Sequence, residues 1–217
     1  MTTFHPRTRH LLAQAGLMPR ELDALDHPAR YHLPETSQGF GLISTCPGTG
    51  KTWTMALRVA RLVDAAVRQQ PDPARAKLCW VDGDVARDRR ILWTNWHDQV
   101  EDIHRRRFDD VWVDSWAGWA EWVPLLVLDD LGRERYEGEK DPARAVLVRV
   151  LDTRHRCKLP VLWTGNLTVE ELTSLYGAAL ASRIIGSWPA FEVEGHDLRL
   201  APLLPMAEMK KASGGDA

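Results

Sequence analysis

Cysteine, net charge and long apolar stretches are all scarce in this sequence. The three cysteines, Cys46, Cys79 and Cys157, form no C-x-x-C pair, which argues against zinc ligation and a disulfide framework and fits a reducing cytoplasm. A formal charge of −2 provides no global attraction to nucleic acid, so any such contact must come from a local basic patch. Because no apolar run has the length of a membrane span or a secretory signal, we expect a cytoplasmic protein without a membrane partner.

What the sequence does contain is an alternation of strand-like and helix-like segments from residue 39 onwards. Its 217 residues suffice for one domain with helices on both faces of a sheet. We predict strands at 40–45, 77–81, 125–128 and 159–164, and helices at 52–68, from 82 to about 106, at 141–154 and from 168. Continuous apolar runs such as 125–128 are typical of strands buried on both faces. The pattern predicts an α/β protein with three layers, α/β/α, around a central parallel sheet.

The segment from residue 43 to residue 52, ISTCPGTGKT, is the most informative motif. A strand that enters a glycine-rich turn and then a helix directs backbone N–H groups and the positive helix end at one point. Lys51 is expected to reach the β- and γ-phosphates of a nucleoside triphosphate, and the Thr52 hydroxyl to bind Mg²⁺. The predicted phosphate-binding residues are Pro47, Gly48, Thr49, Gly50, Lys51 and Thr52.

One position departs from the G-x-x-x-x-G-K-[ST] motif. Thr45 stands where the motif has glycine. Because threonine favours extended backbone, we expect it to lengthen the preceding strand by one residue. Threonine at this position argues against tight nucleotide binding more than it argues against a nucleotide-binding site.

Two aspartates follow the apolar run at 125–128. Next to a phosphate-binding loop, Asp129 is predicted to hold Mg²⁺ and Asp130 to polarise an attacking water. Many ATPases have glutamate at the second position, and the shorter aspartate predicts slower hydrolysis. The alternative is a pair of aspartates that merely starts a turn, which the upstream loop makes the weaker interpretation.

Asn166 and Arg183 complete the set of candidate residues. Asn166 follows an apolar strand, so it is expected at the ligand-binding edge of a parallel sheet, where it would orient water or touch the γ-phosphate. An ordinary turn asparagine is the alternative. Arg183 follows a helical stretch and could stabilise the transition-state charge in a neighbouring subunit, or it could be a surface arginine paired with an acid.

These segments together resemble a known family. Residues 128–132 (LDDLG), 159–172 and 176–184 are similar to the AAA+ core of DnaC/DnaI-type helicase loaders and of the related IstB-type transposition helpers. Residues 11–20 resemble the lead-in segment of these proteins. The resemblance covers roughly residues 10–200, with a poor match over the tryptophan-rich segment at 80–122.

The resemblance implies a role for each candidate residue. Residues 48–52 would be Walker A, Asp129 and Asp130 Walker B, Asn166 sensor 1, and Arg183 an arginine finger acting in trans between subunits of a homo-oligomer. It also implies a core without a helical lid, ATP and Mg²⁺ as cofactors, and a replicative helicase and single-stranded DNA as partners. The expected organisation is a partly helical arm at 1–35, an AAA+ ATPase domain at 36–205 and a disordered tail at 206–217. The sequence lacks the long helicase-binding domain of the family, and so compact a form would suit a phage or mobile element.

Two basic clusters are candidates for contact with single-stranded DNA. The first contains Arg87, Arg89 and Arg90, with Trp93 or Trp96 nearby to stack on bases. The second lies at 104–107. Interleaved acids favour a solvated helix face of mixed charge as the alternative. Four tryptophans, which recur at intervals of four, three and three, predict one packed helical face rather than a stacking platform; they are Trp112, Trp116, Trp119 and Trp122.

The sequence therefore predicts an ATP-binding and ATP-hydrolysing AAA+ protein that acts as a helicase loader in DNA replication. Three alternatives remain at this point: an IstB-like transposition helper with the same ATPase, a small-molecule P-loop kinase, and a nucleotide switch that does not hydrolyse ATP.

Overall fold

The computed structural model describes residues 4–15, 39–69, 91–136 and 140–193, together with the single residues 17, 19, 22, 25, 138 and 195. The predicted strand at 77–81 and the basic residues 87–90 lie outside these ranges, as does the predicted tail. No helix in the described part of the chain has the length and apolar character needed to span a bilayer.

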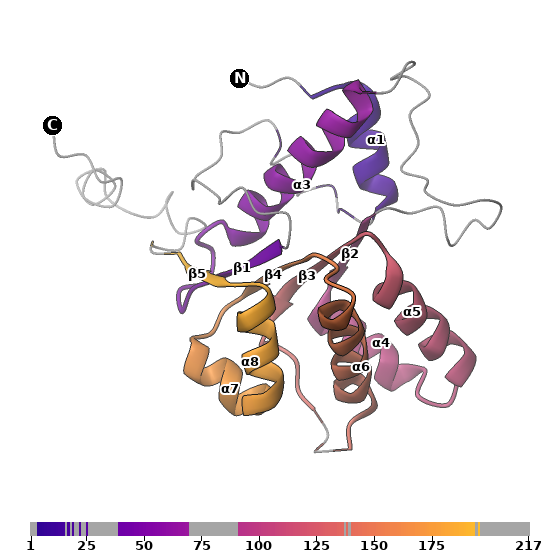
Figure 1. The fold of residues 1–217 in the computed structure, drawn as a ribbon, viewed down its shortest axis with the longest axis vertical. Coiled ribbons are helices and arrows are strands. Elements are labelled where there is room, and N and C mark those ends of the chain that lie inside the picture. The colour runs from indigo at the N-terminus through magenta and orange to yellow at the C-terminus, as the bar shows by residue number, and fades with distance from the viewer. Residues whose placement is uncertain are drawn as a thin grey trace, which may run out of the picture.

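Five parallel strands form the centre of the molecule, in the order β2-β3-β4-β1-β5 (Figure 1). The strands are β1 Gly39–Ile43, β2 Ile91–Asn95, β3 Leu125–Leu131, β4 Val161–Gly165 and β5 Ala190–Glu192. Every residue of β1 and β4 is buried, as a parallel sheet covered on both faces requires.

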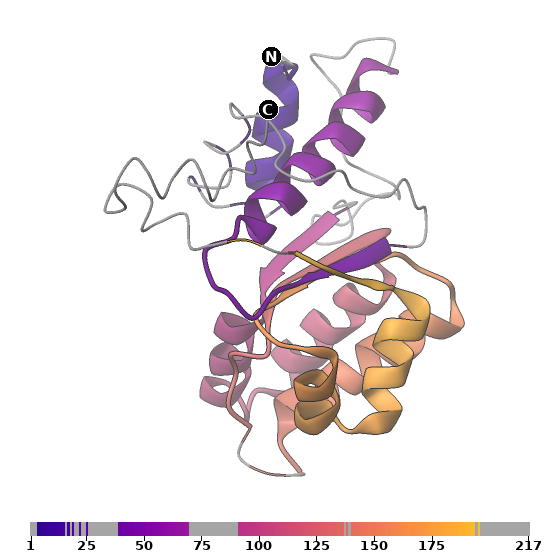
Figure 2. The same cartoon turned by 90° about the vertical axis from the view of Figure 1, so that its left-hand side faces the viewer.

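Helices cover both faces of the sheet (Figure 2). On one face lie α1 Pro6–Gln14 and α3 Lys51–Arg68, which share an apolar cluster with inward residues of β1, β3 and β4. The other face carries α4 Trp96–Arg105, α5 Asp110–Trp122, α6 Pro142–Arg156, α7 Val169–Tyr176 and α8 Ala178–Ser187. The predicted three-layer α/β/α architecture is confirmed.

Local sequence accounts for most helix starts. The Asp141 carboxylate accepts hydrogen bonds from the first turn of α6, with Pro142 at the first helical position. At the start of α7, the Thr168 hydroxyl accepts from the Glu171 N–H at 3.1 Å, and the Glu171 carboxylate accepts from the Thr168 N–H at 2.7 Å. The predicted capping box is therefore present.

Two predictions about the backbone are wrong. Residues 91–95 form strand β2 rather than helix, because Ile91, Leu92 and Trp93 are buried and the segment pairs with β3; the helix begins only after Asn95, which caps it. Thr45 does not lengthen β1. The strand ends at Ile43, and Thr45 lies exposed in a bend in which the Ser44 hydroxyl accepts a hydrogen bond from the Cys46 N–H.

The tryptophan-rich segment forms helix α5, as its spacing predicts. Trp112, Trp116 and Trp119 pack against the core, whereas Trp122 keeps 61% of its surface exposed. The rings of Trp116 and Trp96 lie 6.0 Å apart. This helix is therefore mainly a covering layer for the sheet.

The carboxylate of Asp64 on α3 fastens α1 to the domain. It accepts hydrogen bonds from the His5 N–H at 2.7 Å, from the Thr8 hydroxyl at 2.8 Å and from the Arg68 guanidinium at 2.6 Å. Burial alone would raise the pKa of Asp64, but these donors lower it below its usual value. Since Leu11 and Leu12 are also buried, the described part of the expected arm packs on α3.

Arg154 is a fully buried cation that joins α6 to its neighbours. Its guanidinium donates to the carbonyl oxygens of Ala120 at 2.9 Å, Val123 at 2.7 Å and Pro160 at 2.6 Å, and weakly to a fourth carbonyl at 3.3 Å. Burial lowers the pKa of Arg154 to about 9, so the side chain is still charged at neutral pH. These bonds fix the chain where it enters β3 and β4.

Replacing Arg154 with methionine should lower the free energy of unfolding by about 3 kcal/mol, because buried carbonyl groups lose their donors. Urea unfolding followed by circular dichroism measures the change. Arg156→Met, at an exposed position of the same helix, is the matched control and should change stability by no more than about 0.5 kcal/mol. Equal unfolding midpoints for the two variants would show that the Arg154 contacts contribute nothing.

Candidate nucleotide-binding site

The loop at 44–50 leaves the carboxyl end of β1 and leads into α3. Gly50, the residue before the helix, has φ 91°, and Gly48 has φ 72°, a left-handed backbone that favours glycine. The Lys51 ammonium lies within the loop and donates to the Cys46 carbonyl at 3.3 Å and to the Thr49 hydroxyl at 3.2 Å. Only 6% of Lys51 is exposed. The loop therefore combines a helix N-terminus with a buried positive charge, the arrangement that binds phosphate.

A buried carboxylate lies directly beside this loop. Asp129 Oδ1 accepts hydrogen bonds from the Thr52 hydroxyl at 2.8 Å and from the Thr164 hydroxyl at 2.6 Å. The three residues come from β3, α3 and β4, and Asp129 is 3% exposed. The structure thus brings together Thr52 and Asp129, as the sequence predicts. Thr164 is a further residue of the site that sequence reasoning did not identify, although it ends the apolar run just before Asn166.

The oxygen atoms of Thr52 and Asp129 fit Mg²⁺. Hydroxyl and carboxylate oxygens are hard ligands, and Mg²⁺ is held in proteins by one or two carboxylates together with substrate phosphates and water. Among the described residues, no group of three or more histidines, cysteines, aspartates and glutamates could hold a metal alone. A single carboxylate beside a phosphate-binding loop therefore suits Mg²⁺ better than a metal that needs an all-protein cage.

Asp130 adopts an unusual backbone conformation, with φ 65°. Such a conformation costs a non-glycine residue on the order of 1–3 kcal/mol and needs support from its surroundings. The support is visible: the Asp130 N–H donates to the Thr164 hydroxyl at 2.9 Å, while the carboxylate accepts from Asn166 Nδ2 and Arg133 Nη1, each at 2.7 Å. The pairing of β3 with β4 is irregular between Leu128 and Leu131, where the two aspartates lie.

Asn166 lies where the sequence predicts, just beyond the end of β4 and in contact with Asp130. Its Oδ1 atom is buried and has no hydrogen-bond partner among the described residues. Buried polar atoms are normally paired. The Nδ2 atom of the same amide donates to Asp130, so Asn166 belongs to the group of residues around the two aspartates and is more than an ordinary turn asparagine.

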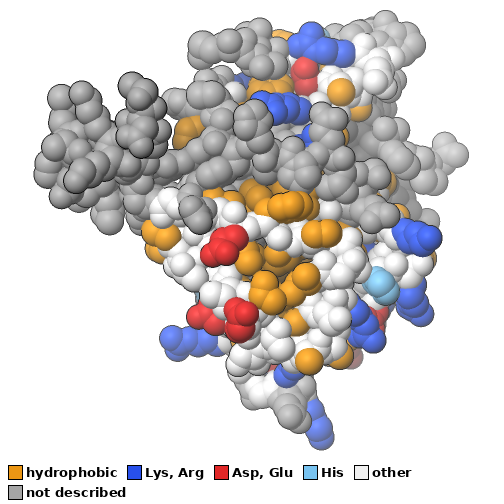
Figure 3. Space-filling view, turned by 60° about the vertical axis from the view of Figure 1, so that its left-hand side comes forward, with side chains coloured by type: hydrophobic (Ala, Val, Ile, Leu, Met, Phe, Trp, Pro, Cys, Tyr) orange, Lys and Arg blue, Asp and Glu red, His pale blue; other side chains and the backbone are white. Residues whose placement is uncertain are grey.

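Arg183 lies apart from this group of residues. It belongs to α8, where its Nη1 atom is 2.9 Å from Asp152 Oδ1 of α6, and its side chain is 43% exposed. Figure 3 shows the face formed by α7, α8 and β5, on which apolar side chains gather. Val169 at the start of α7 and Phe191 of β5 are 39% and 41% exposed. Within one chain the structure joins Thr52, Asp129, Asp130 and Asn166, but not Arg183.

The prediction that Trp93 or Trp96 stacks on bases is wrong. Their exposed fractions are 7% and 0%, and the indole N–H of Trp96 donates to the Tyr136 hydroxyl at 3.1 Å. Both rings fill the space between the sheet and its helices, because β2 presents Trp93 to one face and α4 packs Trp96 against the other. The basic cluster at 87–90 lies outside the described residues.

The second basic cluster does reach the surface. At the end of α4 and in the turn to α5, residues 105–108 are exposed, and Phe108 keeps 86% of its surface accessible. The guanidinium groups of Arg106 and Arg107 lie 4.7 Å and 5.0 Å from the ring centres of Trp112 and Phe108. We call residues 105–112 the arginine–aromatic tip. Acidic neighbours are also present, since Arg105 pairs with Asp102 at 2.8 Å.

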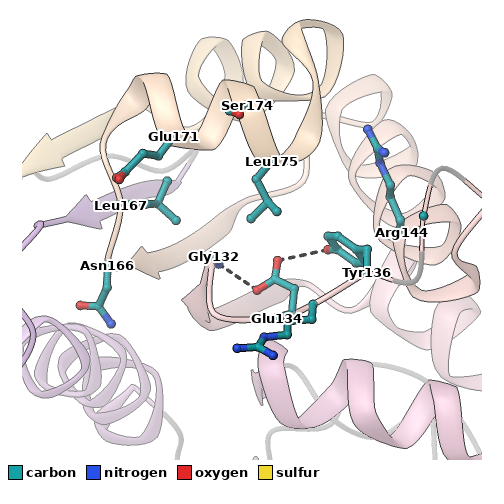
Figure 4. A pocket seen from close by; sticks show the side chains of 11 residues that line it. Gly132, Glu134, Tyr136, Arg144, Asn166, Leu167, Glu171, Ser174 and Leu175 are labelled. Carbon is teal, nitrogen blue, oxygen red and sulfur yellow. Dashed lines mark hydrogen bonds between the residues drawn. The ribbon is translucent and has the colours of Figure 1, made fainter.

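A cavity of about 830 Å³ adjoins the aspartate pair (Figure 4). It lies between the segment that follows β3 and helix α7, with Asn166 and Arg144 at its opposite sides. Glu134, which is 4% exposed, accepts from the Gly132 N–H at 2.8 Å, from the Tyr136 hydroxyl at 3.1 Å and from the Tyr176 hydroxyl. Burial, and then the charge of Glu134, raise the pKa of Tyr176. This network holds the cavity wall in place.

Comparison with known proteins gives structural matches without sequence matches. No family model matches the chain, and no curated protein does. Among solved structures, DnaI is 17% identical, with 87% of this chain and 92% of that chain covered and a TM-score of 0.52. The replication initiator DnaA bound to AMPPCP and single-stranded DNA is 14% identical, with 97% and 60% covered and a TM-score of 0.51.

A DNA replication initiation factor is also similar, at 14% identity, with 97% of this chain and 53% of that chain covered and a TM-score of 0.50. The present chain thus spans little more than half the length of the two initiators. At such identities the likeness concerns the fold. The chain shares the three-layer α/β/α fold of DnaI and of these initiators.

Proposed function

We propose that this protein binds and hydrolyses ATP with Mg²⁺ and acts as an oligomeric helicase loader in DNA replication, contacting a replicative helicase and single-stranded DNA. The observation that carries the proposal is the meeting of Thr52, Asp129 and Thr164 beside the Lys51 loop. The likeness to DnaI supports the loader role. The AMPPCP and single-stranded DNA bound to the similar DnaA support both ligands.

In the proposed mechanism each residue has one task. The loop N–H groups and the Lys51 ammonium bind the phosphates, while Thr52 and Asp129 hold Mg²⁺. When bound, Mg²⁺ supplies positive charge that offsets the charge developing on the phosphate oxygens. Asp130 accepts a hydrogen bond from the attacking water, and Asn166 orients it. Because aspartate is shorter than glutamate, we expect slow turnover.

The alternatives make different predictions. A small-molecule kinase would consume ATP only with its acceptor, which the cavity beside Asn166 could receive. A nucleotide switch would bind ATP without turnover. An IstB-like transposition helper would share every residue of the site and differ in its partner. The segment at 1–35 is the proposed partner contact. Co-purification from the native host, with and without ATP, distinguishes a helicase partner from a transposase.

Lys51→Ala should weaken ATP binding about tenfold or more, because it removes a charged hydrogen-bond donor from the phosphates, and it should abolish turnover. Titration with a fluorescent ATP analogue and a phosphate-release assay measure the two effects. Lys140→Ala, at an exposed lysine, is the control and should behave as the wild type. Undiminished binding by Lys51→Ala would contradict the proposed site.

The proposed oligomer forms through a surface that includes α8 and β5. The exposed face of α8 carries small residues, Ala178, Ala179, Ser182 and Gly186, and Phe191 of the edge strand β5 is partly exposed. An apolar face of this kind is typical of an interaction surface. The proposed occupant is a second copy of the chain, with Arg183 directed at the neighbour's nucleotide.

Arg183→Ala should lower ATP turnover by about a thousandfold or more, as loss of an arginine finger does, without weakening ATP binding. Mixing this variant with Lys51→Ala should restore activity. In a mixed oligomer, some interfaces combine an intact Lys51 from one subunit with an intact Arg183 from its neighbour. Asp152→Ala, which removes only the ion-pair partner in the same chain, should keep turnover. A mixture as inactive as its components would contradict a shared site.

The arginine–aromatic tip is the proposed contact for single-stranded DNA, because it combines cations with an exposed ring. Replacing Arg106 and Arg107 together with glutamine should weaken binding and reduce the slope of log affinity against log salt by about 1.4. Fluorescence anisotropy with an oligonucleotide measures both quantities. Arg156→Gln is the control, and a salt-insensitive wild-type interaction would exclude this contact.

A further inference from the structure

Arg133 lies against the carboxylate to which we assign the attacking water. Its Nη1 atom is 2.7 Å from Asp130 Oδ2, while Asn166 Nδ2 is 2.7 Å from Asp130 Oδ1. The hydrogen bond from Arg133 to Asp130 and the charge of Asp130 raise the pKa of Arg133, so the guanidinium carries its charge at any working pH. Both oxygens of the proposed water-polarising group therefore already accept charged or polar donors.

Such pairing opposes the role of Asp130 in hydrolysis. A carboxylate assists an attacking water by accepting its proton or a strong hydrogen bond. An adjacent guanidinium makes a charge-assisted hydrogen bond to one carboxylate oxygen, which leaves that oxygen less available to a water molecule. A water that approaches Asp130 must also compete with two donors at short distance. As long as both contacts persist, Asp130 is a weak partner for water.

Arg133 forms its ion pair with Asp130, and the charge of Asp98 also acts on the guanidinium. The neighbouring Glu134 is occupied by the Gly132 N–H and by the hydroxyls of Tyr136 and Tyr176. The Arg133 side chain is 60% exposed, whereas that of Asp130 is 17% exposed. Arg133 can therefore leave the carboxylate without disturbing the core, whereas the backbone of Asp130 stays fixed through its N–H and Thr164.

We propose that Arg133 is a positioning residue that restrains Asp130 and slows ATP hydrolysis, an inference that rests on the ATPase function proposed above. The restraint is an ion pair at the protein surface, so it weakens when salt rises. An acidic side chain of a docked partner protein could draw the exposed guanidinium away and raise turnover. Asn166 then remains as the group that orients Asp130.

The test uses the full chain with ATP and Mg²⁺ and compares three variants. Arg133→Gln should raise turnover about two- to fivefold, the range that loss of an exposed ion pair allows, with an unchanged KM. Arg133→Lys, which keeps the charge but not the planar fork, should lie between this variant and the wild type. Arg135→Gln changes an exposed arginine two residues further along and should leave turnover unchanged.

Two further measurements separate restraint from a general structural effect. After correction for ATP affinity, the turnover of the wild type should rise with salt concentration. The turnover of Arg133→Gln should not show this rise. Binding of the non-hydrolysable analogue AMPPCP and the melting temperature should be the same in both proteins. In a background of Asp130→Asn, the Arg133→Gln change should have no effect on turnover, because the two residues act as a pair.

The outcomes distinguish this inference from the proposed function. Suppose that Lys51→Ala abolishes turnover but that the turnover of Arg133→Gln equals or falls below that of the wild type. The proposed restraint is then overturned, while the ATPase function stands. A turnover below that of the wild type would instead assign Arg133 to phosphate binding. If neither the wild type nor Arg133→Gln shows turnover that depends on Lys51, the ATPase itself is overturned, and the restraint with it.

Discussion

The buried carboxylate of Asp129 is the interaction on which the site depends. A charged group that is 3% exposed would be costly without hydrogen bonds, and it receives them from Thr52 and Thr164. These bonds fasten the first turn of α3 to β3 and β4. Strand β4 lies between β1 and β3 in the sheet. The Thr164 hydroxyl therefore links β4 to Asp129 of β3, a connection that the phosphate-binding loop after β1 does not provide by itself.

The strain at Asp130 extends this site toward the cavity. Its positive φ lies within β3, where the pairing with β4 is irregular, and this conformation is stabilised by Thr164, Asn166 and Arg133. Immediately beyond, Gly132 donates to the buried Glu134, which fixes the wall of the cavity. The proposed water-polarising group and the cavity are therefore parts of one hydrogen-bonded segment, and Asn166 belongs to both.

Sequence reasoning succeeded where a local pattern has one physical meaning. The glycine-rich loop, the capping box at Thr168 and the apolar run before Asp129 each follow from neighbouring residues. It did not identify Thr164 and Arg133, because a hydroxyl 35 residues from Asp129 and an arginine in a turn carry no local signal of their contacts. The five-residue strand β2 was mistaken for helix, since so short an apolar segment beside a helix lacks a distinctive period.

Arg183 is held by an acidic residue of α6, so this contact must break before Arg183 can act in a neighbouring subunit. Arg154 holds this helix firmly through buried carbonyl contacts, whereas Asp152 holds Arg183 through one partly exposed ion pair. Such a pair is worth at most about 1 kcal/mol, while an arginine finger contributes about 4–7 kcal/mol to the transition state. The gain exceeds the loss severalfold, so the contact seen within one chain does not oppose the proposed role between chains.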